Sequence, residues 1–266
     1  MKTLFRGTGR AIMIMILAAT AAACTVKEDR DVCPCWLEVG FLDREDIKDP
    51  VVLTGWGDAE VFDDNVTTAD YPDTYACQVP RVMLYFGALE GLKTNRHEGH
   101  TVTIPSGAQC DSLYGYHDIV DCRGESARTD VDFHKQFATV TMFVIGGQEV
   151  AEKYRYTVKS GTCGIDILTC EAVEGGYWYR PQPVNGSLRY RLPRQADDTM
   201  TMTVDDADGE TFVFPFGQYI KSVGYDWHAI DLKDIHITLD IVHGKVSVGI
   251  ADWEDADDFQ LKSVEN

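Results

Sequence analysis

An all-β fold with two tandem β-sandwich domains is predicted from three features of the 266-residue chain. From Cys35 onward, apolar residues alternate with polar ones, which is the two-residue period of a half-buried strand. Helical periodicity is nearly absent. Two similar segments recur at an offset of 110 residues, which indicates that the strand pattern occurs twice.

The predicted strands are short alternating runs bounded by clusters of Gly, Pro or Asp. Three runs lie in the first half of the chain and six in the second, at 37–41, 82–86, 102–104, 140–144, 188–192, 200–204, 212–214, 235–241 and 246–250. Two hairpins are expected, because Asp208-Gly209 and His243-Gly244 each separate neighbouring runs. Glycine provides the positive φ that such tight turns need.

The internal repeat aligns residues 101–107 (TVTIPSG) with residues 211–217 (TFVFPFG). At nearly the same offset, the run that begins at Cys35 resembles the run that begins at Ala138. One such match arises easily by chance, but the set indicates two related domains. We therefore expect an N-terminal sandwich over 35–130 and a C-terminal sandwich over 131–254, each with room for six to eight short strands.

The first 23 residues have the composition of a signal peptide. Lys2, Arg6 and Arg10 are the only charged residues, and an uninterrupted stretch of apolar and small residues follows over 11–23. That stretch is too short to span the ~30 Å hydrocarbon core, which needs about 20 helical residues. The segment therefore predicts export and removal of residues 1–23.

Cys24 follows three alanines, and small residues before a cysteine are typical of a bacterial lipoprotein cleavage site. A triacylated Cys24 would hold the chain stably in a membrane. The alternative is ordinary cleavage after Ala23, which would release a soluble protein. Residues 24–34 then form a polar stalk, in which Lys27, Glu28 and Asp29 are either a surface-export signal or part of a solvated linker.

The charge of the chain excludes one class of partner. With 24 basic and 43 acidic residues, the formal net charge is -19, so a polyanion would be repelled and no nucleic-acid partner is expected. Seven cysteines remain after Cys24, and export permits disulfides. Cys163 with Cys170, or Cys110 with Cys122, could close short loops, although the sequence does not determine connectivity.

A search for catalytic motifs gives no candidate. The sequence has no G-x-S-x-G, no H-E-x-x-H, no phosphate-binding loop and no dinucleotide fingerprint. Its histidines are scattered, with His134 just before a strand and His228 in a turn. We expect no catalytic residue, no metal site, no cofactor and no enzymatic activity.

Several features occur together in the order of one family: Cys24 and its acidic stalk, Cys33-Pro34-Cys35-Trp36-Leu37, the run 134–138 (HKQFA), and the stretch from 214 to Trp253. This set resembles the FimB-type fimbrial anchor lipoproteins, which are related to the fimbrillins of Gram-negative gut and oral bacteria. The resemblance implies two transthyretin-like β-sandwich domains. It also implies an assembly protein that attaches a fimbrial shaft to the outer membrane through its lipid, limits the length of the shaft, and keeps an uncut amino terminus.

The acidic tail over 255–266 offers one candidate contact with the shaft. Phe259 and Leu261 alternate as in a donor strand, which would add to the sheet of another subunit. A solvated end of the chain is the alternative. The alternative for the whole protein is a surface glycan-binding lipoprotein, since the same signal, stalk and sandwiches would suit carbohydrate capture.

Overall fold

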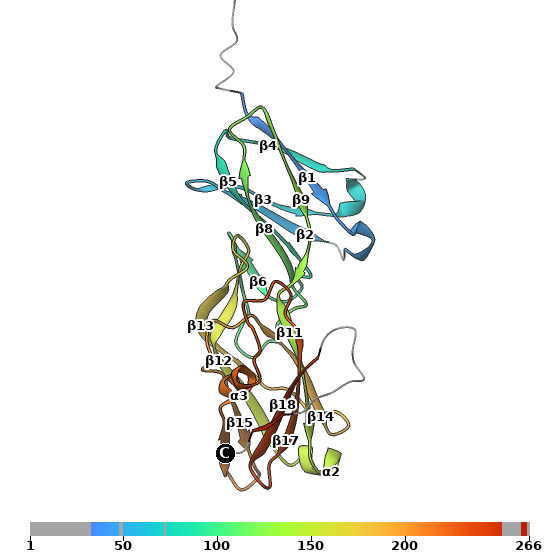
Figure 1. The fold of residues 1–266 in the computed structure, drawn as a ribbon, viewed down its shortest axis with the longest axis vertical. Coiled ribbons are helices and arrows are strands. Elements are labelled where there is room, and N and C mark those ends of the chain that lie inside the picture. The colour runs from blue at the N-terminus through green and yellow to red at the C-terminus, as the bar shows by residue number, and fades with distance from the viewer. Residues whose placement is uncertain (1–32, 48–49, 72, 252–261, 265–266) are drawn as a thin grey trace, which may run out of the picture.

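The computed structural model describes residues 33–47, 50–71, 73–251 and 262–264. These residues form two β-sandwiches that lie one above the other along the long axis of the molecule (Figure 1). The first strand starts at the outer pole of the N-terminal sandwich, and the C-terminal sandwich forms the opposite pole. The prediction of an all-β fold with sandwich domains is confirmed. No helix among the described residues is both long enough and apolar enough to cross a bilayer.

The N-terminal sandwich consists of a three-stranded and a five-stranded sheet, with two 3-10 turns in its loops. The three-stranded sheet has the order β4 (Tyr75–Val79), β1 (Cys35–Phe41), β9 (Ser126–Val131). The five-stranded sheet has the order β10 (His134–Lys135), β8 (Tyr114–Asp121), β5 (Met83–Glu90), β2 (Val51–Trp56), β3 (Glu60–Val66). The 3-10 turns are η2 (Arg44–Asp46) and η3 (Thr68–Asp70).

The C-terminal sandwich pairs a five-stranded sheet with a six-stranded one. The first has the order β14 (Ser187–Pro193), β11 (Phe137–Val144), β17 (Asp234–Asp240), β18 (Lys245–Ala251), β19 (Lys262–Val264). The second has the order β16 (Thr211–Phe214), β15 (Thr201–Asp205), β12 (Arg155–Asp166), β7 (Thr101–Thr103), β6 (Arg96–Glu98), with β13 (Ala172–Tyr179) also paired to β12. Two short helices, α2 (Gly147–Ala151) and α3 (Phe216–Ser222), complete it.

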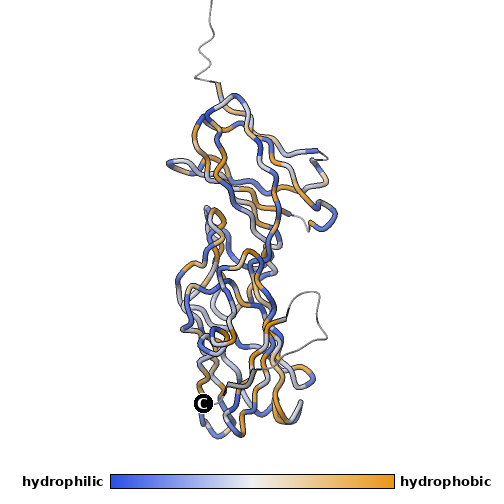
Figure 2. The backbone as a smooth tube through the Cα atoms, viewed as in Figure 1, coloured by the Kyte–Doolittle hydropathy of each residue, from blue (hydrophilic) through white to orange (hydrophobic). Residues whose placement is uncertain are grey.

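The alternating sequence pattern corresponds to alternating burial. In β1, Cys35, Leu37 and Val39 are 0% exposed, whereas Trp36 between the first two is 51% exposed. Each of the nine predicted runs overlaps a strand, and both predicted hairpins form, one between β15 and β16 and one between β17 and β18. Figure 2 shows hydrophobic and hydrophilic segments alternating along both sandwiches.

The first long strand of each sandwich has the same kinds of neighbouring strand. β1 lies between an antiparallel neighbour, β4, and a parallel neighbour, β9. β11 likewise lies between antiparallel β14 and parallel β17. The sequence match between the runs at Cys35 and Ala138 therefore identifies equivalent opening strands.

The match between residues 101–107 and 211–217 does not identify equivalent strands of two domains. Thr101–Thr103 forms β7 and Thr211–Phe214 forms β16, and both strands belong to one sheet of the C-terminal sandwich. The hairpin of β6 and β7 lies in the N-terminal half of the sequence but belongs to the C-terminal sandwich, where β7 pairs with β12. The sandwiches are not strictly consecutive in sequence, and the boundaries 35–130 and 131–254 stay a proposal.

Each sandwich has its own hydrophobic core. Leu37, Leu53 and Phe86 belong to the N-terminal core, and Met142 and Tyr156 belong to the C-terminal one. Two side chains of the N-terminal five-stranded sheet, Val52 and Leu89, pack instead into the C-terminal core. The sandwiches are thus joined by buried apolar contact, which removes nonpolar surface from water and stabilises their arrangement.

Candidate functional site

The junction between the sandwiches depends on two glycines. Gly87 on β5 and Gly115 on β8 lie beneath the turn between β12 and β13. A Cβ at Gly87 would lie 2.7 Å from the backbone oxygen of Ile167, and one at Gly115 would lie 2.9 Å from the Sγ of Cys170. Since carbon and oxygen atoms that are not bonded do not approach this closely, only glycine permits the turn to lie against the sheet.

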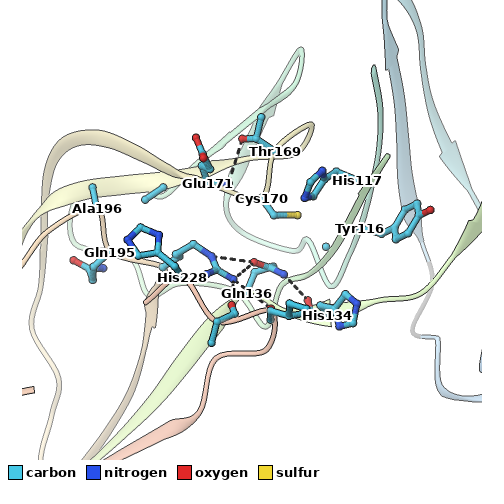
Figure 3. Close-up of a pocket in the computed structure, with 15 residues that line it drawn as sticks. Tyr116, His117, His134, Gln136, Thr169, Cys170, Glu171, Gln195, Ala196 and His228 are labelled. Atoms are coloured by element: carbon cyan, nitrogen blue, oxygen red, sulfur yellow. Dashed lines mark hydrogen bonds between the residues drawn. The ribbon is translucent and has the colours of Figure 1, made fainter. Parts of the chain in front are cut away.

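A cavity of about 620 Å³ opens beside this junction. Figure 3 shows His134 on one side of it and Gln195 and His228 on the other, with Cys170 and Gln136 between them. The lining therefore combines strands of the N-terminal sandwich with loops of the C-terminal one. Its residues are Gly115, Tyr116, His117, His134, Gln136, Thr169, Cys170, Glu171, Ala172, Arg194, Gln195, Ala196, His228, Ala229 and Ile230.

Arg194 is the buried cation of this cavity and is only 6% exposed. Its Nε and Nη2 atoms donate to the Oε1 of Gln136 at 3.2 and 2.7 Å. Nη1 donates to the carbonyl of Trp227, and Nη2 donates to that of Ala229 at 2.9 Å. Burial lowers the pKa of the guanidinium, but an arginine keeps its charge in proteins. Within the described part of the chain, this charge is satisfied by neutral oxygens and not by a carboxylate.

The chain between the sandwiches is held to the loop before β17. His134 Nδ1 lies 3.1 Å from Asp231 Oδ2, and the backbone N of Lys135 donates to Asp231 Oδ1 at 2.7 Å. The Nζ of Lys135, whose side chain is 10% exposed, lies 2.5 Å from Asp234 Oδ1. These contacts fix the edge of the cavity, so its two sides are held together by charged hydrogen bonds as well as by the core.

The chemistry of the lining favours binding a polar ligand over covalent catalysis. Burial raises the pKa of the Cys170 thiol to about 12, so at neutral pH this thiol is protonated and is not an activated nucleophile. Among the described residues, no group of three His, Cys, Asp or Glu side chains is placed to hold a metal ion. The lining provides one buried cation, amide groups and imidazoles, which suit hydrogen bonding to a polar molecule.

The site residues predicted from sequence lie outside the described residues. This is true of the lipidation residue Cys24, the export signal Lys27, Glu28 and Asp29, and the donor-strand residues Phe259 and Leu261. The structure does describe the segment just beyond the last of these. β19 (Lys262–Val264) pairs antiparallel with β18, with Val264 opposite Val246 and Lys262 opposite Val248.

No sequence pattern predicts the junction cavity, because its residues are far apart along the chain. His134 and His228 were noticed only as isolated histidines. A sequence signal existed in the run 134–138, which contains Gln136, but no local spacing links it to Arg194.

The two suggested disulfides do not match the arrangement of the thiols. Cys110 belongs to the C-terminal core and Cys122 to the N-terminal core. Cys163 donates to the carbonyl of Glu174, whereas Cys170 lies against Gly115. All four of these cysteines are free thiols in the structure, so neither of the two possible pairings is formed there.

No family model matches the sequence, and no curated protein matches it. Solved structures do match it. A proposed polysaccharide-binding protein of Bacteroides thetaiotaomicron matches with a TM-score of 0.61 and 11% identity, over 87% of this chain and 98% of that one. A proposed adhesin of Bacteroides ovatus matches with a TM-score of 0.60 and 11% identity, over 88% and 96%. The fimbrial anchor protein Mfa2 of Porphyromonas gingivalis matches with a TM-score of 0.56 and 12% identity, over 83% and 98%.

The likeness covers nearly the whole of each of these structures, so both sandwiches and their arrangement are shared. The resemblance to the fimbrial anchor family is thereby confirmed at the level of the fold. Identities of 11 and 12% establish the fold alone, because one fold supports many functions.

Proposed function

We propose that this protein is a lipid-anchored minor subunit of a fimbria, which attaches the shaft to the outer membrane and limits its length. The observation that carries the proposal is the fold shared with the fimbrial anchor Mfa2 over 98% of that chain. The signal peptide and Cys24 support it from the sequence side. In this role the protein is structural and not an enzyme, its partner is a fimbrillin-type shaft subunit, and it lies at the cell surface.

The position of β1 supports an uncut amino terminus. β1 is hydrogen-bonded on both sides, to β4 and to β9, and Cys35, Leu37 and Val39 fill the N-terminal core. Removing this strand would expose that core and both neighbouring strand edges to water. A cut in the stalk over 24–34 would separate the lipid from the fold. We expect the mature protein to begin at an acylated Cys24, which mass spectrometry of the intact protein tests.

The positions of the two ends of the molecule suit an anchor. β1 begins at the outer pole of the N-terminal sandwich (Figure 1), so the lipid and the C-terminal sandwich lie toward opposite ends. The C-terminal sandwich would then meet the shaft. The pairing of Lys262–Val264 with β18 supports the idea that the tail can act as a strand.

The tail hypothesis has a direct test. If Phe259 and Leu261 belong to a strand donated to the shaft, deletion of residues 255–266 should abolish shaft attachment while the protein is still exported. Wild-type fimbriation of that deletion strain would rule out the donor strand. Export is followed separately, by protease accessibility on intact cells.

The function itself is tested by deleting the gene in the native host and comparing cell-bound with shed filaments by electron microscopy. A Cys24→Ala strain is the matched variant, because it retains the fold and lacks the lipid. Both strains should shed filaments, and the deletion strain should make longer ones. Unchanged filaments in the deletion strain would contradict the anchor role.

A second candidate function is glycan binding, and the junction cavity is the observation that favours it. Its volume of about 620 Å³ is within the usual range for small-molecule sites, and the exposed side chains of Glu171 and His228 in its lining offer hydrogen bonds to hydroxyl groups. The exposed aromatic residues do not support glycan binding, because Trp36, Tyr85 and Trp178 lie on three different strands. A glycan array with the purified protein tests this function, and Glu171→Ala should abolish any binding to the cavity.

A further inference from the structure

Three thiols meet in the N-terminal core, and the function proposed above does not use them. Cys35 and Cys122 are each 0% exposed, and Cys77 packs against the same core. All three are free thiols in the structure. Burial raises the pKa of the Cys122 thiol, and the neighbouring Cys35 and Cys77 raise it further.

The backbone explains why Cys35 and Cys122 meet. Cys122 directly follows β8, where its N–H donates to the carbonyl of Val82 at 3.0 Å. The chain then turns tightly into β9, and the N–H of Trp36 donates to the carbonyl of Glu125 at 3.0 Å. The turn between β8 and β9 therefore brings Cys122 to the first residue of β1, from the opposite sheet of the sandwich.

The strand register argues against Cys77 as the partner of Cys35. In the pairing of β1 with β4, Cys35 lies opposite Val79, and Cys77 lies opposite Leu37. Cys35 and Cys77 are thus diagonal neighbours, which are about 7–8 Å apart in an antiparallel pair. A disulfide needs Cα atoms within about 7 Å and Cβ atoms about 4 Å apart. Cys122 approaches Cys35 by another route: its N–H donates to Val82, which lies three residues after Val79, the strand partner of Cys35, across a turn closed by the N–H of Val82 and the carbonyl of Pro80.

We propose that the exported protein carries a disulfide between Cys35 and Cys122, which joins the first residue of β1 to the end of β8. The inference rests on the proposed function in one respect, because disulfides form and persist outside the reducing cytoplasm. The bond would link the three-stranded sheet to the five-stranded sheet at the pole where the stalk enters.

The reaction needs an oxidant, and a disulfide of a periplasmic thiol oxidoreductase provides it. The thiolate of Cys35 attacks one sulfur of that disulfide, which forms a mixed disulfide and releases the oxidant's other sulfur as a thiolate. The thiolate of Cys122 then attacks Cys35 Sγ and expels the first sulfur of the oxidant. The two electrons of the new bond's formation reduce the oxidant, and the two protons lost by the cysteine thiols are taken up by its two sulfurs, which become a dithiol.

Burial determines when this reaction takes place. Burial, followed by the neighbouring Cys35, raises the pKa of the Cys122 thiol to about 12, so in the folded protein Cys122 is almost never the thiolate that closes the bond at neutral pH. The bond therefore forms while the chain folds, before the core closes. Once formed, it is 0% exposed at both cysteines and is protected from reducing agents in solution.

The cross-link has a mechanical consequence for an anchor. A pull on the stalk enters the fold at Cys35, and without a disulfide only the hydrogen bonds and packing of β1 resist it. With the disulfide, part of the load passes directly to β8, the strand beside the junction with the C-terminal sandwich.

The test maps the cysteines of the lipidated protein itself. Cells are treated with acid and then alkylated under denaturing conditions, and the protein is extracted in detergent, digested without reduction and analysed by mass spectrometry. The expected result is one peptide pair that joins Cys35 to Cys122, with Cys77 alkylated. In a second arm, the full-length chain is produced in a reducing cytoplasm, purified, unfolded and then refolded in a glutathione redox buffer.

The two arms test two claims separately: that Cys35 pairs with Cys122, and that the protein is exported. Alkylated Cys35 and Cys122 in the refolded chain would overturn the pairing, as would a link from either of them to Cys77. A pair in the refolded chain together with free thiols in the cellular protein would overturn the proposed export and not the pairing.

Variants provide an independent readout. Cys35→Ser and Cys122→Ser should each lower the Tm of the N-terminal sandwich by about 10 °C or more, and the double variant should add little, because one bond is lost in all three. Cys77→Ser is the matched control and should keep the cross-link. An oxidised wild-type chain with the same Tm as chain refolded under reductant would overturn the proposal.

Discussion

The backbone oxygen of Ile167 lies 2.7 Å from the point where a side chain on Gly87 would begin. Ile167 also donates its N–H to the carbonyl of His100 at 2.7 Å, so the turn that carries it is tied to the β6–β7 hairpin and cannot move freely. The arrangement of the two sandwiches thus depends on the absence of one Cβ atom.

Gly87→Ala should destabilise the protein by about 1–3 kcal/mol, because the new methyl group forces the turn away from β5. Thermal unfolding followed by circular dichroism measures the loss. Gly176→Ala is the control, since a Cβ at Gly176 meets nothing within 4 Å. Equal stability of the two variants would mean that the junction adapts without cost.

Arg194→Met should destabilise the protein by about 2–4 kcal/mol, because Gln136 and the carbonyls of Trp227 and Ala229 lose their donor. Urea unfolding is the measurement. Arg123→Gln is the control, because this guanidinium is paired with Asp121 on the surface, where an ion pair adds little. A variant at Arg194 as stable as the control would show that solvent replaces these hydrogen bonds.

Asp111 should make stability depend on pH. Burial raises the pKa of this carboxyl, but hydrogen bonds from the backbone of Asn95, Lys93 and Thr94 outweigh it and hold the pKa below its ordinary value. The carboxylate therefore stabilises the fold above the unfolded pKa of about 4, and this contribution is lost as the pH falls through the folded pKa.

The matching variant is Asp111→Asn, which should cost about 1–3 kcal/mol at pH 7. Its difference from wild type should shrink as the pH is lowered below about 4 in urea titrations. Asp58→Asn, on an exposed turn, should behave as wild type throughout. If the stability difference between Asp111→Asn and wild type stayed constant with pH, the effect would come from the shape of the side chain and not from its charge.

Deletion of residues 262–266 should expose the edge of β18, because β19 is its outer neighbour in the sheet. Faster amide hydrogen exchange in Lys245–Ala251 is the expected result, with unchanged exchange in β14 at the opposite edge. An uncovered edge strand also promotes association, so light scattering should detect larger species. Unchanged exchange in β18 would mean that the tail does not protect it.

The prediction of strands succeeded where burial follows the local period. Cys35, Leu37 and Val39 alternate with exposed residues in β1, and such a pattern is readable in a single sequence. It failed for β2, whose Val51, Val52 and Leu53 are all buried, and the predicted runs also left out β3, β4, β8, β9, β12 and β13. It also missed α3, whose buried Phe216, Tyr219 and Ile220 fill only two turns.

The sequence by itself determined three properties: the strand-rich class of the chain, the equivalence of the strands that begin near Cys35 and Ala138, and the acidic net charge. Each of these properties depends on composition or on the order of neighbouring residues. Only the tertiary structure decided that Arg194 meets Gln136, that Cys122 meets Cys35, and that the β6–β7 hairpin joins the C-terminal sandwich. These contacts join residues far apart in the chain. They form because closing a long loop costs little more than closing a short one, so the burial gained in the folded core, and not sequence distance, selects the partners.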